Sequence, residues 1–124
     1  MDKLNRARRL HTLLQLLPEL PVPETGLYFG EHVIRVSGQL CLVVTLKGQV
    51  GIRATDSELE TQLQRICAED HWIAHGRVYE QWYLLPDTVD HNSDQVAAWV
   101  RQAALGAARL AEDEQRPAKA GRLR

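Results

Sequence analysis

Two histidines four residues apart, His71 and His75, follow the carboxylates of residues 69–70 and form the pattern closest to a metal site. On a helix, histidines at this spacing can share one zinc ion. The neighbouring Trp72 and Gly76 instead favour a short strand that ends in a turn, and residues four apart on a strand lie about 13 Å from each other. We therefore predict two polar strand positions, no metal ligand and no cofactor.

A second group of titratable residues, Asp87, Asp90, His91 and Asp94, lies in a polar loop that precedes a helical pattern. Carboxylates are expected near a helix N-terminus because they cap backbone amides and suit the helix dipole. A general acid–base pair would also need a pocket, which spacing alone does not establish. We predict no catalytic residue and no enzyme activity. The alternative is a small enzyme with its site at this loop.

The aromatic residues raise the question of a base-stacking platform for nucleic acid. Such a platform needs exposed aromatic rings flanked by lysine or arginine. The strands that carry the aromatic residues here are acidic or neutral, so core packing is the favoured interpretation. The residues concerned are Tyr28, Phe29, Trp72, Tyr79, Trp82, Tyr83 and Trp99.

Charge is distributed unevenly along the chain, although the net charge is −1. Between positions 24 and 100, eleven acidic residues stand against five basic ones, a balance of −6. A folded body with this balance would repel a phosphate backbone, so we expect it not to bind nucleic acid directly. Weak DNA binding through the basic ends is a second alternative. The contacts would then be Arg6, Arg8, Arg9, Arg116 and Lys119.

The stretch of residues 26–54 is the element around which the other elements are organised. It predicts three short strands joined by glycine turns at Ser37-Gly38 and Lys47-Gly48. The middle strand is apolar on both faces and must therefore lie inside a sheet, beneath another layer. Strict alternation would place Leu40, Leu42, Val44 and Leu46 on one face of the sheet and Cys41, Val43 and Thr45 on the other.

Three helical patterns surround this sheet. The first is predicted over residues 3–17, where leucines recur at helical spacing. The second begins at a capping box in which the Thr55 hydroxyl accepts from a first-turn amide. The third begins after Asn92 or Ser93 and buries a stripe that includes Trp99.

The predicted fold class is α+β: a helix, a three-stranded antiparallel meander, a helix, two strands and a helix. The two later strands are expected over residues 71–75 and 77–85. Residues 18–26 carry three prolines and are predicted to be an irregular connector. Residues 1–112 are expected to form a single domain, and residues 113–124 a disordered basic tail.

Cys41 and Cys67 lie in apolar patterns with no cysteine or histidine at metal spacing. Buried reduced thiols in a cytoplasmic protein are the favoured interpretation, and a disulfide is the alternative. No apolar run approaches the roughly 20 residues that cross a bilayer. The basic N-terminal segment leads to Pro18 without a small-residue cleavage site, so neither a signal peptide nor a membrane segment is expected.

Several short segments, in order and spacing, resemble the N-terminal domain of the TfoX (Sxy) family of bacterial competence regulators. The resemblance covers residues 26–109, and a glycine-turned meander with a Leu/Val-rich central strand is part of it. The matching segments are Tyr28-Phe29-Gly30, Ile52-Arg53-Ala54-Thr55-Asp56, Trp82-Tyr83-Leu84-Leu85-Pro86 and Ala98-Trp99-Val100-Arg101-Gln102-Ala103-Ala104.

The resemblance implies a secretion-chaperone-like α+β fold without enzyme activity or cofactor. It implies a regulatory domain that acts in transcriptional control of DNA uptake through a protein partner, with the cyclic-AMP receptor protein as a partner class. A second copy of the chain, forming a homodimer, is a further partner to consider. The residues that the resemblance assigns to partner binding are Tyr28, Phe29, Gly30 and Arg53.

Overall fold

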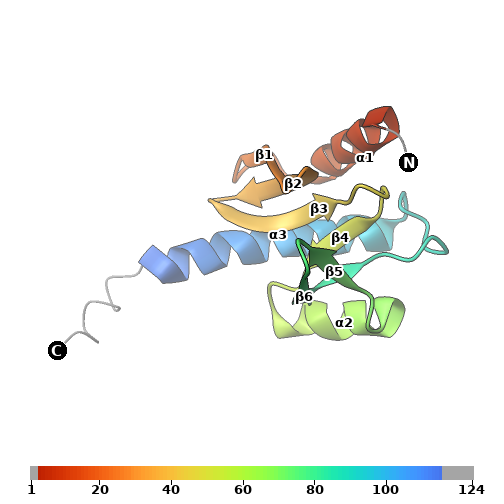
Figure 1. Ribbon diagram of the computed structural model, residues 1–124. Helices are drawn as coiled ribbons and strands as arrows, with labels where there is room; N and C mark the ends of the chain where they lie inside the picture. Colours follow the sequence, from red (N-terminus) through yellow and green to blue (C-terminus); the bar gives the residue numbers. More distant parts are fainter. Residues whose placement is uncertain (1–2, 116–124) are drawn as a thin grey trace.

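The computed structural model describes residues 3–115, which form an α+β fold of three helices and one six-stranded sheet (Figure 1). The predicted class is confirmed, but the sheet has six strands where five were predicted. The elements are α1 (Lys3–Leu16), β1 (Pro23–Tyr28), β2 (Glu31–Val36), β3 (Gln39–Val44), β4 (Val50–Arg53), α2 (Ser57–Cys67), β5 (His71–Ala74), β6 (Arg77–Leu84) and α3 (Asp94–Gln115).

The sheet is antiparallel throughout, with strand order β1-β2-β3-β4-β6-β5. Three of its hairpins turn on two residues that both have positive φ: Phe29-Gly30, Ser37-Gly38 and His75-Gly76. Positive φ at both central residues is the type I′ arrangement, which matches the twist of antiparallel strands. The predicted turns at Ser37-Gly38 and Gly76 are therefore confirmed, and Gly48 also has positive φ in the longer β3–β4 loop.

The additional strand is β1, and the prediction of an irregular connector over residues 18–26 is wrong at its C-terminal end. Pro23 is the first residue of β1, and β1 lies at the edge of the sheet. A proline is tolerated there because its missing N–H is not needed for a second neighbouring strand. The chain then reverses at Phe29-Gly30, so the first predicted strand of the meander is in fact a hairpin.

The predicted strict alternation along the middle strand is also wrong, because β3 contains a bulge. Ile34 pairs with Leu42 while Arg35 pairs with Leu40, which leaves Cys41 without a partner on β2. Cys41 and Leu42 consequently both pack beneath the helices, whereas Leu40 lies on the opposite face. A bulge turns two successive side chains to one side, and sequence periodicity does not reveal it.

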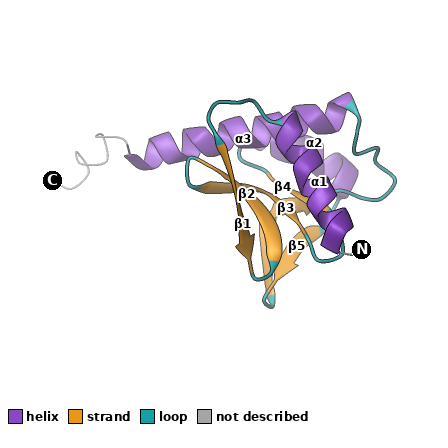
Figure 2. Cartoon of the chain, turned by 90° about the horizontal axis from the view of Figure 1, so that it is seen from above, coloured by secondary structure: helices purple, strands orange, loops and turns teal. Residues whose placement is uncertain are grey.

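All three helices pack on one face of the sheet, and the main core lies between them and the strands. α1 and α3 contact β2 and β3, while α2 contacts β6. Figure 2 shows the helices gathered on one side, and α3 extends beyond the strands at its C-terminal end. The buried members are mostly aliphatic: Leu13, Ile34, Val36, Leu42, Val44, Val50, Ile52, Leu59, Leu63, Leu85, Val96, Val100 and several alanines, together with Tyr83 and Trp99.

The N-terminus of α2 is capped by Asp56, not by Thr55 as the capping-box prediction has it. The Asp56 carboxylate accepts a hydrogen bond of 2.8 Å from the amide of Leu59. The Thr55 hydroxyl instead donates to the carbonyl of Ala103 in α3, at 3.3 Å. An aspartate cap is as favourable as a threonine cap. Because the cap is Asp56, the helix begins one residue later than the capping-box prediction has it.

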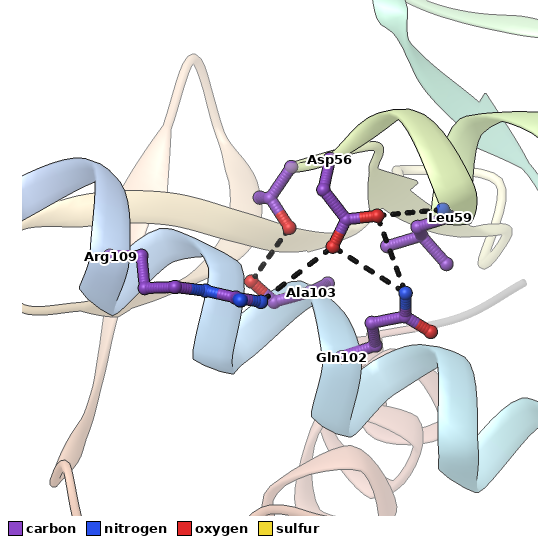
Figure 3. Close-up of polar contacts among 6 residues, drawn as sticks. Asp56, Leu59, Gln102, Ala103 and Arg109 are labelled. Carbon is purple, nitrogen blue, oxygen red and sulfur yellow. Dashed lines mark hydrogen bonds and ion pairs between the residues drawn. The ribbon is translucent and has the colours of Figure 1, made fainter.

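Residues 55–56, which precede α2, can contact α3 because residue 106 of α3 is a glycine. A β-carbon at Gly106 would lie 2.0 Å from the Thr55 hydroxyl oxygen, so only glycine lets Thr55 cross the helix at this distance. Gln102 of α3 donates to the Asp56 carboxylate at 3.3 Å, and Arg109 forms an ion pair with it at 3.7 Å (Figure 3). These contacts attach the start of α2 to the middle of α3.

The last helix begins as predicted, since the Ser93 hydroxyl accepts from the amide of Val96 at 3.2 Å. It continues to Gln115, so residues 113–115 of the predicted tail are helical. The remainder of that tail, residues 116–124, lies outside the described residues. Among residues 3–115, no helix combines the length and the apolar character that crossing a membrane requires.

Candidate functional site

The face of the sheet opposite the helices carries a second, smaller hydrophobic cluster, and we call this surface the inner face. Its buried members are Val33, Val43, Trp72, Ala74, Trp82 and Leu84, with Tyr28, Leu40 and Tyr79 partly buried beside them. No helix of residues 3–115 covers this cluster. An apolar sheet face left uncovered must either curl onto itself or meet another molecule.

The sheet does curl, because its two edge strands touch. The ring of Tyr28 in β1 lies 5.5 Å from the ring of Trp72 in β5, centroid to centroid. In a flat sheet, five strand spacings would separate these strands by about 24 Å. The Tyr28 and Tyr79 hydroxyls are also hydrogen-bonded, at 2.7 Å. The aromatic rings therefore fill the inside of an incomplete barrel.

A buried carboxylate fixes this curl. Glu31, at the start of β2, is only 8% exposed. Its two oxygens accept hydrogen bonds from the indole nitrogen of Trp72 at 2.9 Å and from the amide of Leu46 at 2.8 Å. A buried carboxylate is stable only with such donors, and these two join β2 to β5 and to the β3–β4 loop. Nothing in the local sequence distinguishes Glu31 from an exposed strand residue.

The tips of the two edge hairpins meet at one end of the inner face. Phe29 stacks on His75, with ring centroids 4.0 Å apart, and His75 is hydrogen-bonded to the Tyr79 hydroxyl at 2.8 Å. Both turn residues have positive φ, 51° for Phe29 and 42° for His75. Bulky residues rarely adopt this conformation, and it concentrates at functional sites. Phe29 is nevertheless 62% exposed, so the stack leaves most of its surface available.

The inner face continues from Tyr79 into a hollow of about 460 Å³ that contains two arginines. Arg53 donates to the carbonyl of Leu40 at 3.0 Å and to the Gln39 side chain at 3.3 Å. The guanidinium of Arg77 lies 5.1 Å from the centre of the Tyr79 ring, a cation–π distance. Within residues 3–115, no carboxylate forms an ion pair with either arginine.

The four residues assigned to partner binding are thus brought to one surface. Tyr28, Phe29 and Gly30 form the tip of the β1–β2 hairpin, and Arg53 lines the hollow. Tyr79 connects the two parts, because it lines the hollow and is hydrogen-bonded to Tyr28.

Sequence patterns did not assign His75, Tyr79 or Arg77 to this surface. They suggested His75 only as a candidate metal ligand and Tyr79 only as a core or base-stacking residue. Phe29-Gly30, Ser37-Gly38 and His75-Gly76 share one pattern, a residue followed by glycine. This repeated pattern could have identified His75 as a residue at a hairpin tip.

The preference for core packing of the aromatic residues is correct for some of them and wrong for others. Trp72, Trp82, Tyr83 and Trp99 are buried. Phe29 is exposed, and Tyr28 and Tyr79 are half-buried on the inner face. The strands are not uniformly acidic there either, since Arg53 and Arg77 lie beside Tyr79.

The three described residues of the predicted nucleic-acid contacts lie on α1, away from the inner face. Arg6 and Arg9 donate to the carbonyls of Leu46 and Gly48, at 2.9 and 2.7 Å, and so hold the β3–β4 loop against α1. Arg8 is exposed. The other two predicted contacts, Arg116 and Lys119, lie outside the described residues.

Of the two histidines considered for a metal, His71 is a strand residue as predicted, but the prediction that His75 is one too is wrong. His71 is the first residue of β5 and is hydrogen-bonded to the Trp82 carbonyl at 3.0 Å, whereas His75 forms the turn. In the described part of the chain, no three histidine, cysteine or acidic side chains are grouped so that they could hold a metal ion.

Both cysteines are free and buried within residues 3–115, so their predicted burial is confirmed. Burial raises the pKa of Cys41 to about 12, although the nearby charge of Arg53 opposes the rise. Burial, together with the charge of Asp70, raises the pKa of Cys67 to about 11. Both groups are therefore protonated, unreactive thiols at neutral pH.

The loop of residues 87–94 is organised by its own side chains. The Asp90 carboxylate accepts from the amide of Asn92 at 2.9 Å. Burial, and then the charge of Arg9, lowers the pKa of His91, so its ring is neutral at pH 7. Its Nε2 atom is buried and has no hydrogen-bond partner among the described residues.

No protein-family model matches this chain, and no curated protein matches it with significance.

Proposed function

We propose that this protein is a non-catalytic interaction domain that acts in transcriptional control through a protein partner, as the resemblance to the TfoX N-terminal domain implies. The order of helix, antiparallel strands, helix, hairpin and helix fits the secretion-chaperone-like fold of that family. The cytoplasm is the compartment in which such a regulator would act, and two free thiols are compatible with it.

The observation that carries this proposal is the inner face. It combines an exposed ring at the hairpin tips, Phe29, with Arg53 and Arg77, which form no ion pair with a carboxylate of residues 3–115. Glu80 lines the same hollow, so its lining carries two positive charges and one negative charge. Aromatic and arginine side chains are the residues that contribute most energy at protein interfaces. A segment with acidic residues beside an apolar side chain would complement the hollow at Arg53 and Arg77.

The inner face offers little for catalysis. Among the titratable groups that line the hollow, Tyr79 has a raised pKa, caused first by its hydrogen bond to Tyr28. It is therefore a protonated phenol at neutral pH and no general base. Arginine is protonated at any working pH and serves to bind and orient anionic groups.

Affinity capture from the native cell, with the partner quantified by mass spectrometry, tests this proposal. We expect the Arg53→Gln/Arg77→Gln double variant to lose the partner by about tenfold or more, because two charge-assisted contacts disappear. The matched control is Lys3→Gln/Arg65→Gln, which removes the same charge from exposed positions outside the inner face. Docking at the inner face would be refuted if both double variants lost the partner to the same extent, or if neither variant lost it.

A further inference from the structure

The two edge strands of the sheet differ in how well they are protected against pairing with another strand. β5 is four residues long, and its register with β6 is interrupted by an irregularity. Short strands, bulges and lysine residues are common means of blocking an open edge. β1 is six residues long, pairs with β2 in continuous register, and contains neither lysine nor arginine. Its proline, Pro23, is the first residue and leaves the rest of the strand able to pair.

Apolar side chains lie exposed along β1 and the segment that leads to it. They are Leu20, Val22 and Leu27. Tyr28 and Phe29 contact the β5–β6 hairpin, but β2 is the single strand of residues 3–115 that pairs with residues 23–27. An open edge with exposed apolar side chains can accept a further extended strand.

A pair of opposite charges indicates which strand would fit. Glu24 on β1 is opposite Arg35 on β2, and both lie on the inner face because Arg35 also pairs with Leu40. They nevertheless form no ion pair with each other or with another charged group of residues 3–115. The guanidinium of Arg35 instead lies across Gly26, with a nitrogen 2.7 Å from the place of a β-carbon there. Arg35 therefore brings its charge over the edge strand.

We propose that β1 pairs in antiparallel orientation with β1 of a second copy of this chain, about a two-fold axis through Thr25. A two-fold axis perpendicular to the sheet places residues of the same face opposite each other. Gly26 then lies opposite Glu24 of the second copy, whose carboxylate comes beside the Arg35 guanidinium. The symmetry repeats this contact, so the dimer contains two equivalent pairs of opposite charge, and Leu27 lies opposite Pro23 of the second copy.

The same charges disfavour the neighbouring registers. An axis through Gly26 would bring the two Arg35 guanidinium groups together, and an axis through Glu24 would place the two carboxylates opposite each other. Like charges directly opposite destabilise a pair of strands. The dimer does not depend on the function proposed above, but it would place the inner faces of both copies on the same side of one continuous sheet.

Sedimentation equilibrium of the full chain over a range of concentrations tests the dimer. A six-residue strand extends only about 20 Å, so the contact should be smaller than the roughly 800 Å² per partner of a stable interface, and we expect a dissociation constant in the micromolar range. Leu27→Lys should weaken the dimer about tenfold or more, because a lysine blocks edge pairing. Ile73→Lys is the matched control, since Ile73 is 62% exposed on β5 and Leu27 is 65% exposed. A chain that stays monomeric at about 1 mM would overturn the proposal, as would a dimer that Leu27→Lys weakens no more than Ile73→Lys does.

A charge-exchange experiment tests the register. Glu24→Arg places arginine opposite arginine across the axis, and Arg35→Glu places carboxylate opposite carboxylate. Each variant alone should dimerise about tenfold more weakly than the unchanged chain. An equimolar mixture of the two variants should restore the dimer, because both contacts between the copies then join opposite charges, and mixing cannot restore a contact within one chain. A mixture that dimerises no better than the separate variants would overturn the proposed pairing.

Discussion

The two faces of the sheet bury apolar surface in different ways. The face beneath the helices is sealed by aliphatic side chains and alanines. The inner face has no helix over the part that residues 3–115 describe, and aromatic rings fill it instead. Tyrosine and tryptophan have polar atoms at one end of an apolar ring, and here those atoms bond to each other and to Glu31. Helices therefore seal one face, whereas the other keeps Phe29 and the hollow at Arg53 exposed at its margins.

The largest difference between the two faces should appear when one aromatic residue of each is truncated. Trp99→Ala removes a ring that is 4% exposed and donates to Gln62, and it should lower the free energy of unfolding by about 3–5 kcal/mol. Phe29→Ala removes a ring that is 62% exposed and should cost less than about 1 kcal/mol. Urea denaturation measures both changes. Similar costs would contradict the burial of Trp99 or the exposure of Phe29.

Gly51 tests how tightly the floor of the inner face is packed. A β-carbon at this position of β4 would lie 2.5 Å from a methyl group of Val43 and 3.2 Å from one of Leu84. Gly51→Ala should therefore destabilise the fold by about 1–3 kcal/mol, as overpacking does. Gly26→Ala on β1 is the control, because its new methyl group would come closer than normal contact only to the flexible end of Arg35, at 2.7 Å, while Val33 lies 3.9 Å away. A loosely packed inner face would make the two variants equally stable.

The hydrogen bond between Tyr28 and Tyr79 should contribute a smaller amount. A double-mutant cycle of Tyr28→Phe and Tyr79→Phe should give a coupling energy of about 1 kcal/mol, the usual value of one such bond. The cycle of Tyr28→Phe with Tyr83→Phe is the control. Tyr83 is buried in the main core and accepts from Gln64, so the effects of these two changes should add. Additivity in the Tyr28/Tyr79 cycle would mean that this bond does not couple β1 to β6.

Duplex DNA should show the smallest effect, because neither face is built to bind it. The body between positions 24 and 100 has a balance of −6, and Arg6 and Arg9 are bonded to loop carbonyls. Fluorescence anisotropy at about 150 mM salt should detect at most weak binding that is indifferent to base sequence. Removal of residues 116–124 and neutralisation of Arg6, Arg8 and Arg9 should abolish it. Submicromolar binding that survives these changes would contradict the prediction.

The helix-covered face was largely predictable from the sequence, because periodicity reports burial. The middle strand, apolar on both faces, and the helical stripe around Trp99 both predict burial, and the structure buries Leu42, Val44 and Trp99 in the core. Periodicity gave wrong predictions where local backbone geometry determines the direction of a side chain or the start of a strand. The bulge at Cys41 turns this side chain to the face opposite the predicted one. Pro23 begins an edge strand, although the three prolines of residues 18–26 predicted an irregular connector.

The inner face could not be predicted, because it depends on contacts between distant parts of the chain. Tyr28 and Tyr79 are 51 residues apart, and Glu31 and Trp72 are 41 apart. Local patterns contain no information on such pairs. The motif at residues 28–30 pointed to the hairpin tip, but only the curl of the sheet brings His75, Tyr79 and Arg77 beside it.

The most direct test of the docking face is NMR mapping of the partner once it has been captured. The labelled 124-residue chain is titrated with it, and the amide, indole and guanidinium signals are followed. We predict that the largest shifts cluster at Phe29, Leu40, Arg53, Arg77 and Tyr79, while signals of α1 and the solvent side of α3 stay in place. Shifts concentrated on α1 or α3, with the signals of Arg53 and Tyr79 unchanged, would contradict the assignment of the inner face as the binding surface.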